Sequence, residues 1–159
     1  METKNEINNK NLHKNKVHKV LSHSYLMYFI LFLAGVCLDL IFKFKIYTNP
    51  IWTSLGILFL TLGTLLIIWA QRISRNLKKD IINRENFCRG PYCYTRNPTH
   101  WGLLFLILGF GIIANAPFVI FSAFVSFVIA KFIFLNKQEE ILALKYGDPY
   151  LEYKKLVKF

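Results

Sequence analysis

Residues 51–70 read IWTSLGILFLTLGTLLIIWA, twenty consecutive positions without a charged side chain. About 20 helical residues cross the hydrocarbon core of a bilayer, so this stretch predicts a transmembrane helix. Three further apolar runs lie near residues 25–42, 101–114 and 117–135. The run at 101–114 is short for a full span, and only a tight helical hairpin fits between it and the next run. The fold class that follows is all-α: a polytopic membrane helical bundle with about four transmembrane helices.

The composition agrees with a membrane protein and argues against a nucleic-acid-binding one. The 159 residues are 54% hydrophobic and 16% aromatic, more apolar surface than a soluble domain of this size can bury. The net charge is +11, but the basic residues fall between the apolar runs and do not form one soluble face. We therefore expect the lipid bilayer, and no nucleic acid, as a partner.

The basic residues also predict an orientation. They gather in a polar N-terminal tail (1–23), in a middle segment (71–100) and in the C-terminal segment (136–159). Cytoplasmic loops of membrane proteins carry an excess of Lys and Arg, so both termini and the middle segment are predicted to be cytoplasmic. The compact size and the Lys, Asn and Ile content favour a bacterial inner membrane. After the tail, residues 24–159 are expected to form a single domain.

The three cysteines are Cys37, Cys88 and Cys93. Their spacing matches neither a disulfide framework nor a zinc site. They are predicted to be free thiols in a reducing compartment, and no metal site is expected.

The first polar segment with candidate chemistry ends just before the third apolar run. Gly90-Pro91 predicts a turn, and Pro98 suits the first turn of the following helix. A helix N-terminus presents unpaired N–H groups and a partial positive charge, so with Arg96 beside it this segment is a candidate seat for an anionic group. The alternative is interfacial anchoring, because Arg, Tyr and Trp gather at membrane surfaces without any ligand.

The second segment follows the fourth apolar run and begins with the adjacent carboxylates of Glu139 and Glu140. Beside a membrane they are suited to a ligand ammonium or a pair of ribose hydroxyls; the alternative is ordinary pairing with Lys along an exposed helix. Gly147 is then predicted to end a helix and Asp148 to cap a new one. That short C-terminal helix would place three apolar or aromatic side chains on one face, namely Tyr150, Tyr153 and Val157. It is expected to lie in the interface or to pack back onto the bundle.

Together the two segments carry a family resemblance. They read Gly90-Pro-Tyr-x-Tyr-x-Arg96-Asn-Pro-x-x-x-Gly102 and Glu139-Glu140-x-x-x-Leu144-x-Tyr-Gly147-x-x-Tyr150-x-x-Tyr153-x-x-x-Val157, with a helical hairpin between them. Each motif alone is weak, but the ordered pair is specific. Over residues 84–159 the chain resembles the superfamily of isoprenylcysteine carboxyl methyltransferases and phospholipid methyltransferases. The resemblance implies an integral membrane methyltransferase that uses S-adenosylmethionine on a lipophilic small-molecule or lipid acceptor.

The resemblance also implies a cofactor site built from segments 84–102 and 136–159. Its residues would be Tyr92, Arg96, Asn97, Pro98, Thr99, His100, Glu139 and Glu140. His100 stands where the family usually has Tyr; it is a candidate base, although a packed or interfacial His is the more common case. Leu135 stands where the prenylcysteine enzymes carry an Arg, which weakens that acceptor and leaves the cofactor assignment intact.

Two other readings stay open at this stage. The C-terminal halves of NADPH-dependent membrane sterol reductases share part of the pattern, and a non-catalytic membrane protein could retain the fold. The sequence does not identify the acceptor, the acceptor atom (O, N or S) or the oligomeric state. Of the charges inside the apolar runs, Lys131 is expected to reach the interface and Asp39 to lie near Lys43.

Overall fold

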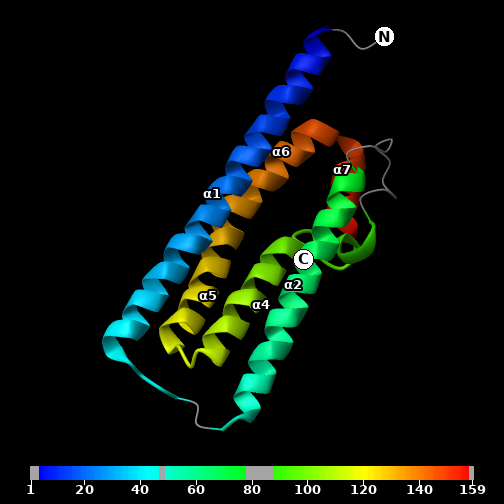
Figure 1. Ribbon diagram of the computed structural model, residues 1–159. Coiled ribbons are helices and arrows are strands. Elements are labelled where there is room, and N and C mark those ends of the chain that lie inside the picture. Colours follow the sequence, from blue (N-terminus) through cyan, green and yellow to red (C-terminus); the bar gives the residue numbers. More distant parts are fainter. Residues whose placement is uncertain (1–3, 47–48, 78–87, 158–159) are drawn as a thin grey trace.

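The computed structural model describes residues 4–46, 49–77 and 88–157, and within these ranges the regular structure is helical throughout. The elements in chain order are α1 (Lys4–Phe42), α2 (Ile51–Leu77), the 3-10 helix η1 (Gly90–Cys93), α4 (Pro98–Ile113), α5 (Pro117–Ile129), the π-helix η2 (Ala130–Leu135), α6 (Asn136–Tyr146) and α7 (Asp148–Leu156). Figure 1 shows α1, α2, α4 and α5 side by side as one bundle. The predicted all-α fold class is confirmed.

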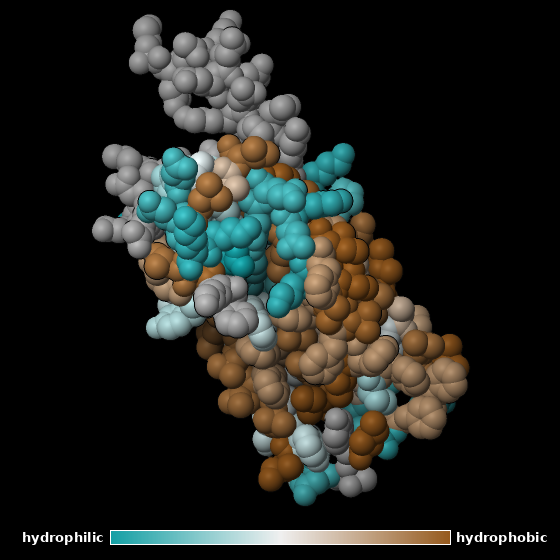
Figure 2. Space-filling view, turned by 180° about the vertical axis from the view of Figure 1, so that it is seen from behind, coloured by the Kyte–Doolittle hydropathy of each residue, from teal (hydrophilic) through white to brown (hydrophobic). Residues whose placement is uncertain are grey.

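Three helical stretches are long and apolar enough to cross a bilayer: Lys19–Phe42, Ile51–Arg75 and Pro117–Leu144. The remaining predicted span, at residues 101–114, corresponds to α4, which has 16 residues and is about 24 Å long at 1.5 Å per residue. It is therefore shorter than a typical hydrocarbon core, as its sequence predicted. Side chains on the outer faces of α1, α2 and α5 are apolar and exposed, which suits contact with lipid. Figure 2 shows this apolar surface along the middle of the molecule, with most hydrophilic side chains gathered at one end and fewer at the other.

The polar segments meet at the same end of the bundle. Figure 1 shows α6, α7 and the C-terminal part of α2 at the end from which α1 extends toward the N-terminus. The α1–α2 and α4–α5 connections lie at the opposite end. The predicted N-terminal tail is helical from Lys4 onward and continuous with the first span.

Helices α2 and α4 pack closely because glycines face each other across their interface. A Cβ atom added to Gly63 would lie 2.7 Å from the carbonyl oxygen of Gly102, and one added to Gly109 would lie 2.7 Å from that of Gly56. Real Cβ atoms do not approach so closely, so only glycine fits these positions. Small residues that let backbones approach are the usual device of helix packing in membranes. This pair of helices positions the segment that enters α4.

On the other side of the bundle, α1 packs along α5 and closes its N-terminus. The Asp39 carboxylate accepts hydrogen bonds from the backbone N–H groups of Phe118 (3.2 Å) and Val119 (2.9 Å). These N–H groups lie in the first turn of α5, where no intrahelical partner exists. A charged side chain inside a predicted span thus has a structural role, as the cap of a neighbouring helix.

Candidate functional site

A network of charged side chains joins the two predicted segments at the polar end of the bundle. Arg96 Nη1 lies 2.9 Å from Glu139 Oε1, and Lys154 Nζ lies 2.8 Å from Glu139 Oε2. Each oxygen of the Glu139 carboxylate therefore faces one cation. The side chains of Arg96 and Glu139 are 16% and 11% exposed, whereas that of Lys154 is 44% exposed. The Arg96–Glu139 pair is consequently little screened by water, while Lys154 covers it from the solvent side.

The position of Glu139 depends on the π-helix that precedes α6. Six residues, Ala130–Leu135, follow the i to i+5 pattern between α5 and α6. A π-turn holds one more residue than an α-turn, so it rotates everything that follows about the helix axis. Glu139 faces the Arg96 segment from one turn beyond this π-helix, and Glu140 points to the exposed side. π-Helical segments of this kind occur frequently at functional sites.

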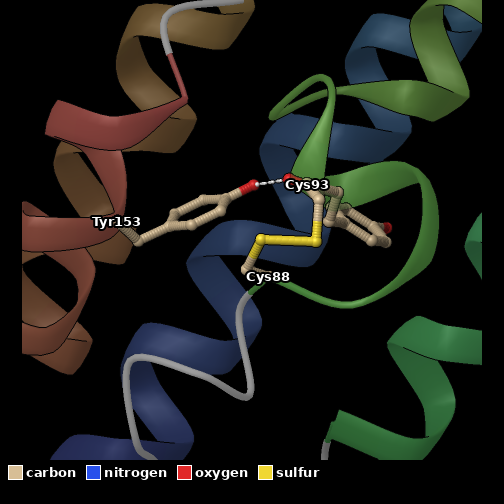
Figure 3. The surroundings of a disulfide bond; sticks show 4 residues. Cys88, Cys93 and Tyr153 are labelled. Carbon is tan, nitrogen blue, oxygen red and sulfur yellow. Dashed lines mark hydrogen bonds between the residues drawn. A yellow bond between two sulfur atoms is a disulfide. The ribbon is translucent and has the colours of Figure 1, made fainter.

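The loop before α4 is folded back on itself by η1. Gly90 has a φ of +57°, which favours glycine, and Pro91 follows it in the first turn of η1. Cys88 and Cys93 come together in this loop, with their Cα atoms 4.5 Å apart, and form a disulfide (Figure 3). The prediction of free thiols is therefore wrong for these two residues, because a short helical turn closes the five-residue separation. Cys37 is free, as predicted.

Helix α7 is tied to this loop by a hydrogen bond. The Tyr153 hydroxyl donates to the Tyr92 carbonyl oxygen over 2.6 Å, drawn as the dashed line in Figure 3. Tyr150, Tyr153 and Val157 are all buried, which confirms the predicted apolar face of α7. The helix packs on α6 and on the loop. Gly147, with a φ of +62°, ends α6 and also precedes α7, so Asp148 is the first helical residue of α7 and not the predicted cap.

The three tyrosines near the network are held in their neutral form. Burial raises the pKa of Tyr150 well above its ordinary value, and the negative charge of Glu139 acts in the same direction. Burial also raises the pKa of Tyr153 and the pKa of Tyr92. For Tyr92, a hydrogen bond with Ser74 of α2 acts in the opposite direction. The site thus offers neutral aromatic rings beside a single buried carboxylate.

The remaining predicted residues lie where α4 begins. Asn97 is the residue that precedes α4 and makes no side-chain cap, and Pro98 is the buried first residue of the helix. Thr99 and His100 turn toward α1 instead: the Thr99 side chain is hydrogen-bonded to Tyr25, and His100 Nε2 lies 3.0 Å from Ser24 Oγ. The structure thus brings Tyr92, Arg96 and Glu139 together around α7. It places Thr99 and His100 against α1 and leaves Glu140 exposed.

Three residues of this cluster were not among the predicted site residues: Tyr150, Tyr153 and Lys154. The two tyrosines belong to the quoted C-terminal motif, and their spacing of three residues was the available signal. Lys154 carried no signal, because it lies among other lysines in a basic tail. Within the described residues, no group of three or more His, Cys, Asp or Glu side chains is arranged to hold a metal ion.

Comparison with known proteins agrees with the resemblance found in the motifs. The family model for phospholipid methyltransferase matches residues 29–149, which is more than half of the chain. The match runs from the middle of α1 into the first turn of α7 and includes Arg96 and Glu139. No curated protein and no solved structure gave a significant match. With apolar helices fit to span a bilayer and both motifs in order, the chain belongs to the phospholipid methyltransferase family.

Proposed function

We propose that this membrane methyltransferase uses S-adenosylmethionine and binds it at the polar end of the bundle, around the Arg96–Glu139–Lys154 network. One observation carries the proposal. The largely buried Arg96–Glu139 pair joins the segment before α4 to α6. The two residues are 43 positions apart in the chain (139 − 96), and both segments carry the family resemblance. Burying a carboxylate costs hydration free energy. This cost is offset when the carboxylate pairs with nearby cations or with a charged group of a ligand.

The residues present fit the cofactor. Its amino-acid end carries one carboxylate and one ammonium. Arg96 and Lys154 can bind the carboxylate, and Glu139 can bind the ammonium. The N-terminus of α4 adds N–H groups and a partial positive charge beside Arg96. The neutral rings of Tyr150 and Tyr153 supply an apolar wall suited to an aromatic base.

When bound, the cofactor supplies a methyl group already activated on a sulfonium. The work left to the chain is therefore alignment and exclusion of water, not acid–base chemistry on the donor. Tyr153 holds α7 against the loop, and Lys154 covers the network from solvent. The acceptor is lipophilic and enters from the bilayer, since exposed apolar faces surround the bundle below this end.

Titration calorimetry of S-adenosylhomocysteine into the detergent-purified protein tests the proposal. The matched variants are Glu139→Gln and Glu140→Gln, the same change at a buried and at an exposed neighbour. A hydrogen bond to a charged group contributes about 1.5–3 kcal/mol, so Glu139→Gln is expected to weaken binding by about tenfold to a hundredfold and Glu140→Gln by less than about twofold. No binding to the native protein, equal effects of the two variants, or binding of NADPH in a parallel titration would contradict the proposal.

A further inference from the structure

A second polar cluster lies beside the proposed cofactor site, on the side toward α1. Ser24 and Tyr28 are four residues apart, hence on one face of α1, and both point at His100 in the first turn of α4. All three side chains are at most 2% exposed. Ser24 Oγ lies 3.0 Å from His100 Nε2, and the Tyr28 and His100 ring centroids are 5.9 Å apart. Ser24 and Tyr28 precede the region that the family model matches.

Two polar atoms of this cluster have no hydrogen-bond partner among the described residues: the Tyr28 hydroxyl and His100 Nδ1. Buried polar groups without partners are rare and cost about 1–3 kcal/mol each. Both atoms belong to side chains that touch each other, at the level where α1 enters the membrane. A hydrogen-bonding group that reached both atoms would satisfy them.

We infer that Ser24, Tyr28 and His100 bind the uncharged polar group, a hydroxyl or a neutral amine, of the lipophilic methyl acceptor. This inference rests on the proposed methyltransferase function. The three side chains bear no formal charge when His100 is neutral, so an ionised head group would lose its hydration without gaining a counter-charge. A hydroxyl or neutral amine both donates and accepts, and it therefore satisfies Tyr28 and either tautomer of His100.

The surroundings fit a ligand with an apolar tail. Leu26 and Phe29 lie near Ser24 and Tyr28 in the sequence of α1 and are 55% and 57% exposed. Helix α1 packs chiefly along α5 and α6, and its residues Ser24 and Tyr28 contact His100 of α4. An acceptor whose tail lies along α1 in the bilayer would have its head group near these three side chains. His100 is also close in sequence to residues 96–98, which are part of the proposed cofactor site.

Quenching of Trp101 fluorescence in phosphatidylcholine nanodiscs tests the inference, because Trp101 is next to His100 and the other tryptophans can be removed as Trp52→Phe and Trp69→Phe. The probes are dibrominated stearyl alcohol and dibrominated stearic acid, which differ only in the head group. We expect the alcohol to reach half-maximal quenching at about a tenfold lower concentration than the ionised acid, the effect of one or two buried hydrogen bonds.

Two variants remove the unpartnered atoms with little change in shape. Tyr28→Phe deletes only the hydroxyl, and His100→Gln keeps a group able to pair with Ser24 while losing Nδ1. Each is expected to abolish the preference for the alcohol and to leave S-adenosylhomocysteine binding within about twofold, whereas Tyr94→Phe, at an 81% exposed tyrosine, changes neither. Equal quenching by both probes in the native protein, or a preference that survives both variants, would overturn the inference. If only the cofactor proposal were wrong, S-adenosylhomocysteine would not bind to the protein, while the preference for the alcohol probe would remain.

Discussion

At the residue scale, the hydroxyl of Tyr153 is the smallest group on which the arrangement of α7 depends. It donates a 2.6 Å hydrogen bond to the Tyr92 carbonyl, from a ring that is almost fully buried. Tyr153→Phe leaves the ring in place and the carbonyl without this donor, so we expect a loss of about 1 kcal/mol in the free energy of unfolding. In a chain of this length that lowers the unfolding midpoint by about 2–4 °C, measurable by thermal unfolding in detergent.

The matched control for Tyr153→Phe is Tyr94→Phe, which removes the same hydroxyl from an exposed ring two residues beyond Tyr92. The control is expected to unfold within about 1 °C of the native protein, because exposed substitutions have small effects. If both variants unfold at the native temperature, the hydrogen bond does not hold α7 in the folded protein. The proposed site would then lack its cover.

Single residues also show how much of the site could be predicted from the sequence. Arg96 was predicted from its place before a helix N-terminus, and it lies in the network. Glu139 and Glu140 could not be told apart, because adjacent helical residues differ by about 100° in direction and the π-helix shifts that direction again. The Cys88–Cys93 pairing was missed because it depends on a local 3-10 turn, η1, and the spacing of the two cysteines does not show that this turn forms.

At the element scale, the sequence predicted where the long helices lie in the chain, but it did not predict which helices pack against each other. Apolar runs fix where a chain can cross a membrane, so the ends of α1 at Phe42 and of α2 at Ile51 matched the expected limits. Which helices touch depends on small residues whose role appears only in pairs. Gly56 and Gly63 on α2 meet Gly109 and Gly102 on α4, an antiparallel match at equal seven-residue spacing.

That glycine interface gives a prediction for Gly63→Leu. A Cβ atom at this position would approach the Gly102 carbonyl oxygen and the Leu106 backbone nitrogen to 2.7 Å, and both are backbone atoms that cannot rotate away. Overpacking of this kind costs about 1–3 kcal/mol or more, so we expect a lower unfolding midpoint and a larger aggregated fraction on size-exclusion chromatography. Leu62→Val changes the neighbouring, exposed residue and serves as the control. Native-like behaviour of Gly63→Leu would mean that α2 and α4 are not in direct backbone contact.

At the scale of the whole molecule, two features of the polar end disagree about the compartment that it faces. The excess of Lys and Arg in the tail, the middle segment and the C-terminal segment predicts that this end is cytoplasmic. The Cys88–Cys93 disulfide lies at the same end, and disulfides are rare in a reducing cytosol. The charge distribution acts while the chain inserts into the membrane, whereas a disulfide forms only once folding has brought the two cysteines together. We therefore expect charge to decide the topology.

Labelling of single cysteines in bacterial cells decides between the two. In a background with the three native cysteines changed to Ser, Tyr94→Cys reports on the polar end and Lys45→Cys on the α1–α2 connection, and both positions are exposed. A membrane-impermeant maleimide is expected to label Lys45→Cys in intact cells and Tyr94→Cys only after permeabilisation. The reverse order would place the cofactor site on the outer side, where the disulfide is stable but S-adenosylmethionine is not made. Topology and cofactor would then be incompatible, so the labelling order also tests the proposed function from outside the site.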